Sequence, residues 1–137
     1  MRFTDVEIAY MHTQGLGRLA TVQVNPVMFR YHPDYDAIEI GGRSMATTRK
    51  FRNLAGNHRV TLVIDDVLSR QPWRVRYLEV RGTAEQVYTS AGPWPGTDGA
   101  IIRIHPRRII SFGLDESDSQ LGSERSSSRI PCGVRGT

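Results

Sequence analysis

Helical crossovers at regular spacing are missing from this chain. Alternating or apolar runs at residues 16–24, 25–31, 37–41, 59–66, 76–88 and 100–112 are separated mostly by connections of hairpin length. Strands joined in this way pair antiparallel, whereas a parallel sheet needs a crossover of a dozen or more residues after each strand. The pattern therefore predicts a mainly β chain, a small antiparallel barrel of six or so strands with short helices at its rim.

Two short helices interrupt the strands. Residues 4–14 begin with Thr4, and Glu7 follows three residues later, which is the pattern of a capping box. Residues 44–57 read as a second helix with Ser44 as its N-cap, Phe51 and Leu54 on one face, and Gly56 at its end.

The remaining segments read as turns and loops. Residues 67–75 and 89–99 carry prolines, glycines and the two tryptophans, so we expect loops there. Gly82 predicts a bulge within its strand, and Pro106 is expected to break the last apolar run into separate strands.

The chain of 137 residues is long enough for a single domain. We expect residues 1–114 to form the folded barrel. Residues 115–137 are rich in Ser, Gly and Arg and have few apolar side chains, so we expect a disordered tail.

Composition excludes several classes of protein. The chain has no apolar run of about 18 residues that could span a membrane, and its N-terminus lacks the apolar region of a signal peptide. The single Cys132 permits no internal disulfide and no thiolate metal cluster, so we expect a cytoplasmic protein without a metal site. Asp65 and Asp66 could serve a metal or acid–base site, but a solvated strand end is the favoured interpretation.

Positive charge is the more informative part of the composition. Seventeen of the 18 basic residues are arginine, Lys50 is the exception, and the formal net charge is +4. A GC-rich genome would explain the preference for arginine, yet such a surface still favours anionic partners, because guanidinium binds phosphate and carboxylate groups bidentately. The basic segment lacks the interleaved aromatic side chains that nucleic-acid binding requires, so we expect no nucleic acid as partner.

The segment at residues 41–53, GGRSMATTRKFRN, concentrates chemistry suited to phosphate. A Gly-Gly turn leads into a helix start, where hydroxyl groups and cations alternate. Free N–H groups, hydroxyls and positive charges together are what a phosphate group needs, although a capped surface helix with solvated cations would read alike.

With this segment, the chain resembles the pyridoxamine-phosphate-oxidase-like split β-barrel family. The matching stretches are FTDVEIAYM, LGRLATV, NPVMFRY, IGGRSMATTRKFRN, HRVTLVIDDV, PWRVRYLEVRGTAE and AIIRIHPRRIISFGL, which together cover residues 3–114. Within that family the chain is similar to the actinobacterial branch that uses the deazaflavin coenzyme F420, which includes a reductase of tetracycline-type antibiotic biosynthesis.

The resemblance implies a homodimer of six-stranded split barrels with two cofactor sites at the subunit interface. The cofactor phosphate would meet Arg43, Thr47, Thr48, Arg49 and Lys50, with Asn53 in support. Asn25, Pro26, Val27 and Met28 would lie along the cofactor ring, and Trp73 would contribute from the second subunit.

One departure from the family pattern lies between the first two strands. Relatives usually have a hairpin turn there, whereas only Gln23 separates RLATV from VNPVMF in this chain. Either a deletion has fused two strands into one, or several loop residues are absent from the sequence. We expect a turn near Gln23, because a single strand from Arg18 to Tyr31 would be about 45 Å long.

The resemblance implies an oxidoreductase that moves a hydride from reduced F420 to an unsaturated organic substrate, in which the cofactor carries the reactivity. A proton donor could be Tyr77, His105 or solvent, and catalytic residues stay unassigned. FMN in the same site is the alternative cofactor, and a non-catalytic flavin- or haem-binding protein is a further alternative.

Overall fold

A computed structural model of the chain describes residues 2–42, 45, 48–90, 94, 96–114 and 122–126. Two helices and seven strands follow one another in the described part: α1 (Asp5–Thr13), β1 (Leu16–Ala20), β2 (Val24–His32), β3 (Ala37–Ile40), α2 (Arg49–Asn53), β4 (Arg59–Arg70), β5 (Trp73–Tyr88), β6 (Ala100–Phe112) and β7 (Gly122–Ser126). The mainly β prediction is confirmed.

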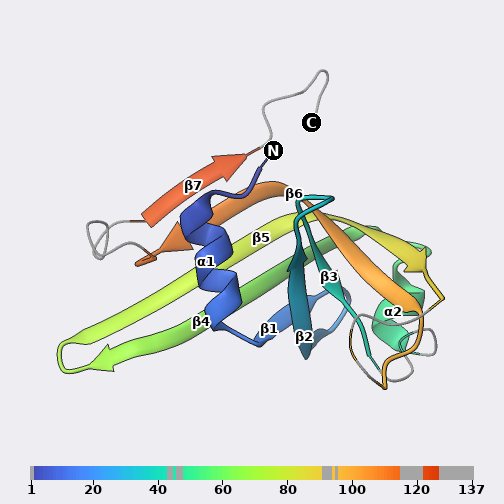
Figure 1. The fold of residues 1–137 in the computed structure, drawn as a ribbon, viewed down its shortest axis with the longest axis horizontal. Coiled ribbons are helices and arrows are strands. Elements are labelled where there is room, and N and C mark those ends of the chain that lie inside the picture. Colours follow the sequence, from blue (N-terminus) through green and yellow to red (C-terminus); the bar gives the residue numbers. More distant parts are fainter. Residues whose placement is uncertain are drawn as a thin grey trace.

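The strands close into a barrel. All pairs are antiparallel in the order β3–β2–β1–β4–β5–β6, and an additional pairing of β3 with β6 closes the ring of six. Closure leaves β4 and β5 projecting as a long hairpin at one end of the molecule, while α2 lies at the other end (Figure 1). The predicted six-stranded split barrel is therefore the fold of this chain.

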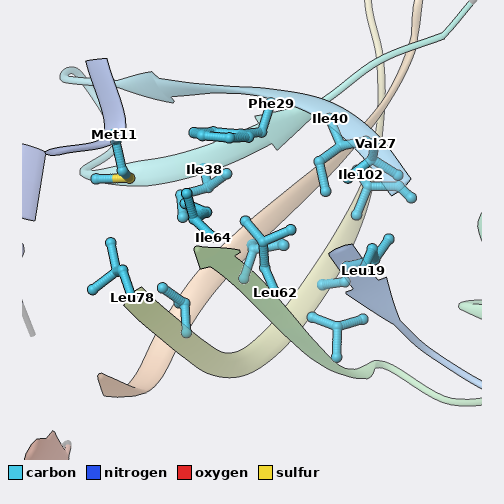
Figure 2. Close-up of a cluster of buried hydrophobic side chains, with 14 of the residues drawn as sticks. Met11, Leu19, Val27, Phe29, Ile38, Ile40, Leu62, Ile64, Leu78 and Ile102 are labelled. Carbon is cyan, nitrogen blue, oxygen red and sulfur yellow. The ribbon is translucent and has the colours of Figure 1, made fainter. Parts of the chain in front are cut away.

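Inward-facing aliphatic side chains fill the barrel (Figure 2). Ile38 and Ile40 from β3, Leu62 and Ile64 from β4, and Ile102 from β6 are fully buried. Burial of each such side chain contributes about 1.5–3 kcal/mol to folding. Met11 of α1 completes one end of this cluster, so the N-terminal helix is part of the core.

Helix α1 begins as predicted. The Thr4 hydroxyl accepts a hydrogen bond from the Glu7 N–H at 3.2 Å, and the Glu7 carboxylate accepts one from the Thr4 N–H at 2.8 Å. The capping box is confirmed, and it turns Met11 and Tyr10 toward the barrel.

The turn near Gln23 is also confirmed. Strands β1 and β2 pair from Leu16 opposite Met28 to Ala20 opposite Val24, so only residues 21–23 lie between them. The Thr21 N–H donates to the Gln23 carbonyl at 2.9 Å. A three-residue hairpin loop therefore suffices, and neither a fused strand nor additional loop residues are needed.

Several predicted boundaries were wrong. Strand β4 continues past Asp66 to Arg70, and β5 begins at Trp73, so residues 67–75 form the tip of the β4–β5 hairpin rather than a loop. Helix α2 has Thr48 as its N-cap in place of Ser44, which lies outside the described residues. Phe51 and Leu54 are buried together as predicted.

Strand β6 is continuous through Pro106, and the predicted break there is a bulge. Arg81 lies opposite Arg108 and Gly82 opposite Pro106, so Arg107 is an extra residue without a ladder partner. A Cβ at Gly82 would lie 2.1 Å from the His105 carbonyl oxygen. The bulge predicted at Gly82 is confirmed, and the absence of a side chain at Gly82 lets the two backbones approach.

Residues Gly122–Ser126 differ from the expected disordered tail. They form β7, which pairs antiparallel with the outer part of β6. Arg125 donates to the Glu7 carboxylate at 2.5 and 2.8 Å and to the Arg2 carbonyl at 3.0 Å. The segment thus packs beside the N-terminus of α1 (Figure 1) through an ion pair whose acid is buried.

We predict that Gly82→Ala destabilises the fold by about 3 kcal/mol, because the added methyl group collides with the backbone of β6 at His105. Urea unfolding followed by circular dichroism measures this effect. Gly15→Ala is the matched control, since a Cβ at Gly15 meets nothing within 4 Å. Equal stability of the two variants would show that the bulge adapts freely.

Candidate functional site

The strand β2 and the segment at residues 41–53 meet at one end of the barrel. Phe29 pairs with Ile40, the last residue of β3, so the chain leaves the sheet at Gly41 and Gly42 beside the first half of β2. Among the described residues, the edge of β2 over Val24–Met28 that faces away from β1 has no strand partner. Its backbone polar groups therefore lie at an open edge, where a ligand can pair with them.

The predicted ring-contacting residues alternate across β2. Val27 points into the core and is buried, whereas Pro26 and Met28 are exposed on the outer surface of the barrel. Asn25 is half-buried and lies opposite Leu19. The outer face of β2 thus presents apolar side chains at the level where its edge is open.

The phosphate-like segment is partly described. Arg43 and Thr47 lie outside the described residues, and only the backbone of Arg49 and Lys50, in the first turn of α2, is described. The Thr48 hydroxyl accepts from the Phe51 N–H at 3.2 Å and donates to the Met45 carbonyl at 2.7 Å. Thr48 therefore positions the start of α2 through its own hydroxyl.

The other end of α2 is tied to the barrel. The Gln86 side chain of β5 donates to the Phe51 carbonyl at 2.7 Å, and the Asn53 carbonyl accepts the N–H groups of Gly56 and Asn57. Half-buried Asn53 lies in the last turn. The helix is thus fixed at both ends relative to the end of β3.

Trp73 does not join this cluster within one chain. It opens β5 at the tip of the β4–β5 hairpin, where it is 62% exposed and pairs with Arg70. Figure 1 shows that this hairpin projects from the end of the molecule opposite α2. A contact between Trp73 and the other predicted residues would require a second chain.

The two candidate proton donors lie on the outer surface. Tyr77 stacks on Phe112 with ring centroids 5.7 Å apart and lines a cleft of about 520 Å³ together with Asp65 and Asp66. His105 contacts Glu85 at 2.9 Å.

The acid pair is not a solvated strand end. Asp65 forms an ion pair with Arg18 on the outer face. Asp66, on the opposite face, accepts from the Tyr10 hydroxyl at 2.8 Å and from Arg76 at 3.1 and 2.6 Å. Burial would raise the pKa of Asp66, but the hydrogen bonds from Arg76 and Tyr10 lower it. The described residues contain no group of three His, Cys, Asp or Glu side chains arranged for a metal ion.

A buried carboxylate lies on β3, between its two neighbouring strands β2 and β6. Glu39, 1% exposed, accepts from Arg30 at 3.1 and 2.8 Å and from Arg103 at 2.9 Å, and Arg103 lies 3.8 Å from the Tyr35 ring. Burial would raise the pKa of Glu39, yet the hydrogen bonds and charges of the two arginines lower it. Sequence patterning alone gave no sign of this network, because a charged residue in an alternating strand reads as solvent-facing.

No family model matches the chain. The 5a,11a-dehydrotetracycline/5a,11a-dehydrooxytetracycline reductase of Streptomyces rimosus is 44% identical to it over 122 residues, which cover 84% of this chain and 86% of that enzyme.

Neither described helix has the length and apolar character that a membrane-spanning helix needs.

Solved structures share the fold at low identity. An FAD-binding protein of Mycobacterium smegmatis matches with a TM-score of 0.54 and 18% identity, over 91% of this chain and 97% of that one. A Corynebacterium glutamicum protein provisionally named pyridoxamine 5'-phosphate oxidase matches with a TM-score of 0.54 and 20% identity, over the same shares of the two chains.

We predict that Glu39→Gln lowers stability at pH 7 by about 2–4 kcal/mol, because two arginines lose their shared counter-charge. The sign of the pH dependence follows from the lowered pKa of Glu39. Its contribution is present above the unfolded-state pKa of about 4.3 and is lost as the pH falls through the folded-state pKa. The stability difference between wild type and variant should therefore shrink below about pH 4.

Chemical denaturation at pH 3–7 measures this difference. Glu79→Gln is the control, since the Glu79–Arg81 pair is more exposed and should contribute below about 1 kcal/mol. A constant difference between wild type and the Glu39 variant across this range would contradict the role of the Glu39 charge.

Proposed function

This chain belongs to the pyridoxamine-phosphate-oxidase-like split-barrel family, in the branch of the dehydrotetracycline reductase, and we propose that it is an F420-dependent reductase of an unsaturated tetracycline-type polyketide. The observation that carries the proposal is the 44% identity to that enzyme across 84% of the chain. A small-molecule substrate follows from the same relationship.

The residues present fit a deazaflavin or flavin cofactor. The open edge of β2 over Val24–Met28 offers backbone groups to the polar edge of a ring, and Pro26 and Met28 offer an apolar surface beneath it. The chain then enters the 41–53 segment, whose Arg43, Thr47, Arg49 and Lys50 supply hydroxyl and cationic groups for a phosphate. Thr48 and Asn53 hold the helix that carries Arg49 and Lys50.

When bound, reduced F420 would supply the hydride. The protein's part is to orient the acceptor carbon and exclude water, which accounts for the lack of an evident nucleophile in the sequence. FMN is the alternative cofactor, because it shares the phosphorylated ribityl side chain that the 41–53 segment suits.

A homodimer would complete the site. Leu16 and Met28 lie directly opposite each other on the outer face of the β1–β2 hairpin, 52% and 46% exposed, and Val24 nearby is 68% exposed. A second copy packed on this apolar surface would cover it, and Trp73 of that copy could reach the cofactor.

Light scattering should give a mass twice that of the 15.4 kDa chain. We expect Leu16→Asp to shift the protein toward the monomer, because a carboxylate would be buried without a partner in the interface. Val6→Asp, at another exposed apolar residue on α1, should remain dimeric. A monomeric wild type would overturn the proposed assembly.

The experiment that tests the function is a pair of titrations, with F420 and with FMN, followed by turnover of dehydrotetracycline with reduced F420. We expect tight binding of F420 and its reoxidation coupled to loss of the substrate double bond. Binding of FMN with no binding of F420 would establish the alternative cofactor.

Lys50→Ala probes the phosphate contact in the same assay. Loss of a charge-assisted hydrogen bond to phosphate costs about 1.5–3 kcal/mol, which weakens F420 binding roughly ten- to a hundredfold. Arg2→Ala removes a charge from the exposed N-terminal segment before α1 and should leave binding unchanged. Equal weakening by both variants would indicate general electrostatics instead of a site.

A further inference from the structure

A second basic region lies on the outer face of the barrel, in a cleft of about 560 Å³. The cleft runs across the beginning of β4, the middle of β5 and the bulge of β6, beside the β1–β2 turn. Its polar lining consists chiefly of Asn57, Arg59, Thr61, Arg81, Thr83 and Arg107. No acidic side chain is among the described residues that line it.

The sheet register brings the three arginines together. Arg59 lies opposite Thr83 and Arg81 opposite Thr61, so the two arginines are diagonal neighbours on one face. Arg107 is the extra residue of the bulge, which turns its side chain out of the regular alternation and into the lining of the cleft. Gly82 accommodates this bulge because it has no side chain, and the bulge places Arg107 in the cleft.

Two of these cations differ from several other arginines of the described chain in having no acidic partner. Arg81 pairs with Glu79, a residue of the neighbouring cleft. Arg59 and Arg107 form no ion pair with any described residue, whereas Arg18, Arg30, Arg76, Arg103 and Arg125 each bind an acid. Like charges held this close repel one another, and an anion between them would remove that cost.

Neutral hydrogen-bonding groups complete the lining. The Asn57 side chain already accepts the Arg59 N–H at 3.1 Å, which leaves its NH₂ group as a donor on the cleft side of the turn. Thr61 and Thr83 contribute hydroxyl groups. Thr21 also lines the cleft, and its hydroxyl is buried without a hydrogen-bond partner in the described structure.

We propose that this cleft is a binding site for an oxyanion group, a phosphate or a carboxylate, of a small molecule. The guanidinium groups of Arg59, Arg81 and Arg107 would hold the anion, and Asn57 and the threonine hydroxyls would bind its remaining oxygens. The site shares no residue with the 41–53 segment and does not depend on the identity of the cofactor. Its test is therefore independent of the proposed function.

The test is a titration of the ¹⁵N-labelled full chain with inorganic phosphate alone and with γ-linked triglutamate alone, followed by NMR. We expect saturable shifts of the backbone amides of Thr61, Thr83 and Arg107 with at least one of the two probes. Response to phosphate would identify the ligand class as phosphorylated, and response to triglutamate would identify it as polycarboxylate. No response to either probe at about 10 mM, or shifts confined to residues 45–53, would overturn the proposal.

Charge-removing variants distinguish a defined binding site from nonspecific attraction of anions to a positively charged protein. Arg59→Gln and Arg107→Gln should each weaken binding of the responding probe at least fivefold, about 1 kcal/mol for exposed charges. Arg70→Gln should leave it unchanged, because Arg70 is an exposed arginine at the far end of β4. Both cleft arginines are exposed, so the variants should keep the wild-type melting temperature. Equal weakening by Arg70→Gln would contradict a defined site.

Discussion

The short pairing between β3 and β6 is the interaction on which this barrel depends. Three residues of β3 close the ring, from Ile38 opposite Ile104 to Ile40 opposite Ile102, and Glu39 sits between them opposite Arg103. Backbone hydrogen bonds over so few residues are a weak closure. The Glu39 carboxylate strengthens it by binding Arg30 of one neighbouring strand and Arg103 of the other, so the acid bridges the seam from both sides. An open barrel would leave two unpaired strand edges and expose the core.

Closure at this seam also decides which strand edge stays open. Because β3 ends at Ile40, the first half of β2 keeps one edge open, and the chain that follows carries Thr48 and the basic start of α2 to the same end of the barrel. At the other end, β4 and β5 outrun the ring and carry Trp73 away from it. In the proposed homodimer, a two-fold arrangement would bring Trp73 of each copy toward the open β2 edge of the other.

Local signals in the sequence predicted the elements they control. The capping box at Thr4 and Glu7 is complete within four residues, and the alternation in β2, β3 and β5 is read directly from neighbouring residues. The end of β4 could not be predicted, because Asp66 looks like a terminator until Tyr10 and Arg76, distant in sequence, provide its partners. Strand β7 was missed because it pairs through its backbone with β6, and its Ser- and Glu-containing sequence gives no apolar signal.

The arginine-lined cleft illustrates a different limit of sequence reasoning. The excess of arginine is visible in composition, but composition cannot tell which cations pair with acids and which lie together in a cleft. Arg59, Arg81 and Arg107 are separated by 22 to 48 residues in the sequence, and only the register of three strands places them on one face. That register in turn depends on a single extra residue in β6, since without the bulge Arg107 would occupy an ordinary ladder position. Several arginines in the described part thus hold the barrel and its hairpin together by binding acids, whereas the sheet register gathers Arg59, Arg81 and Arg107 around an open cleft.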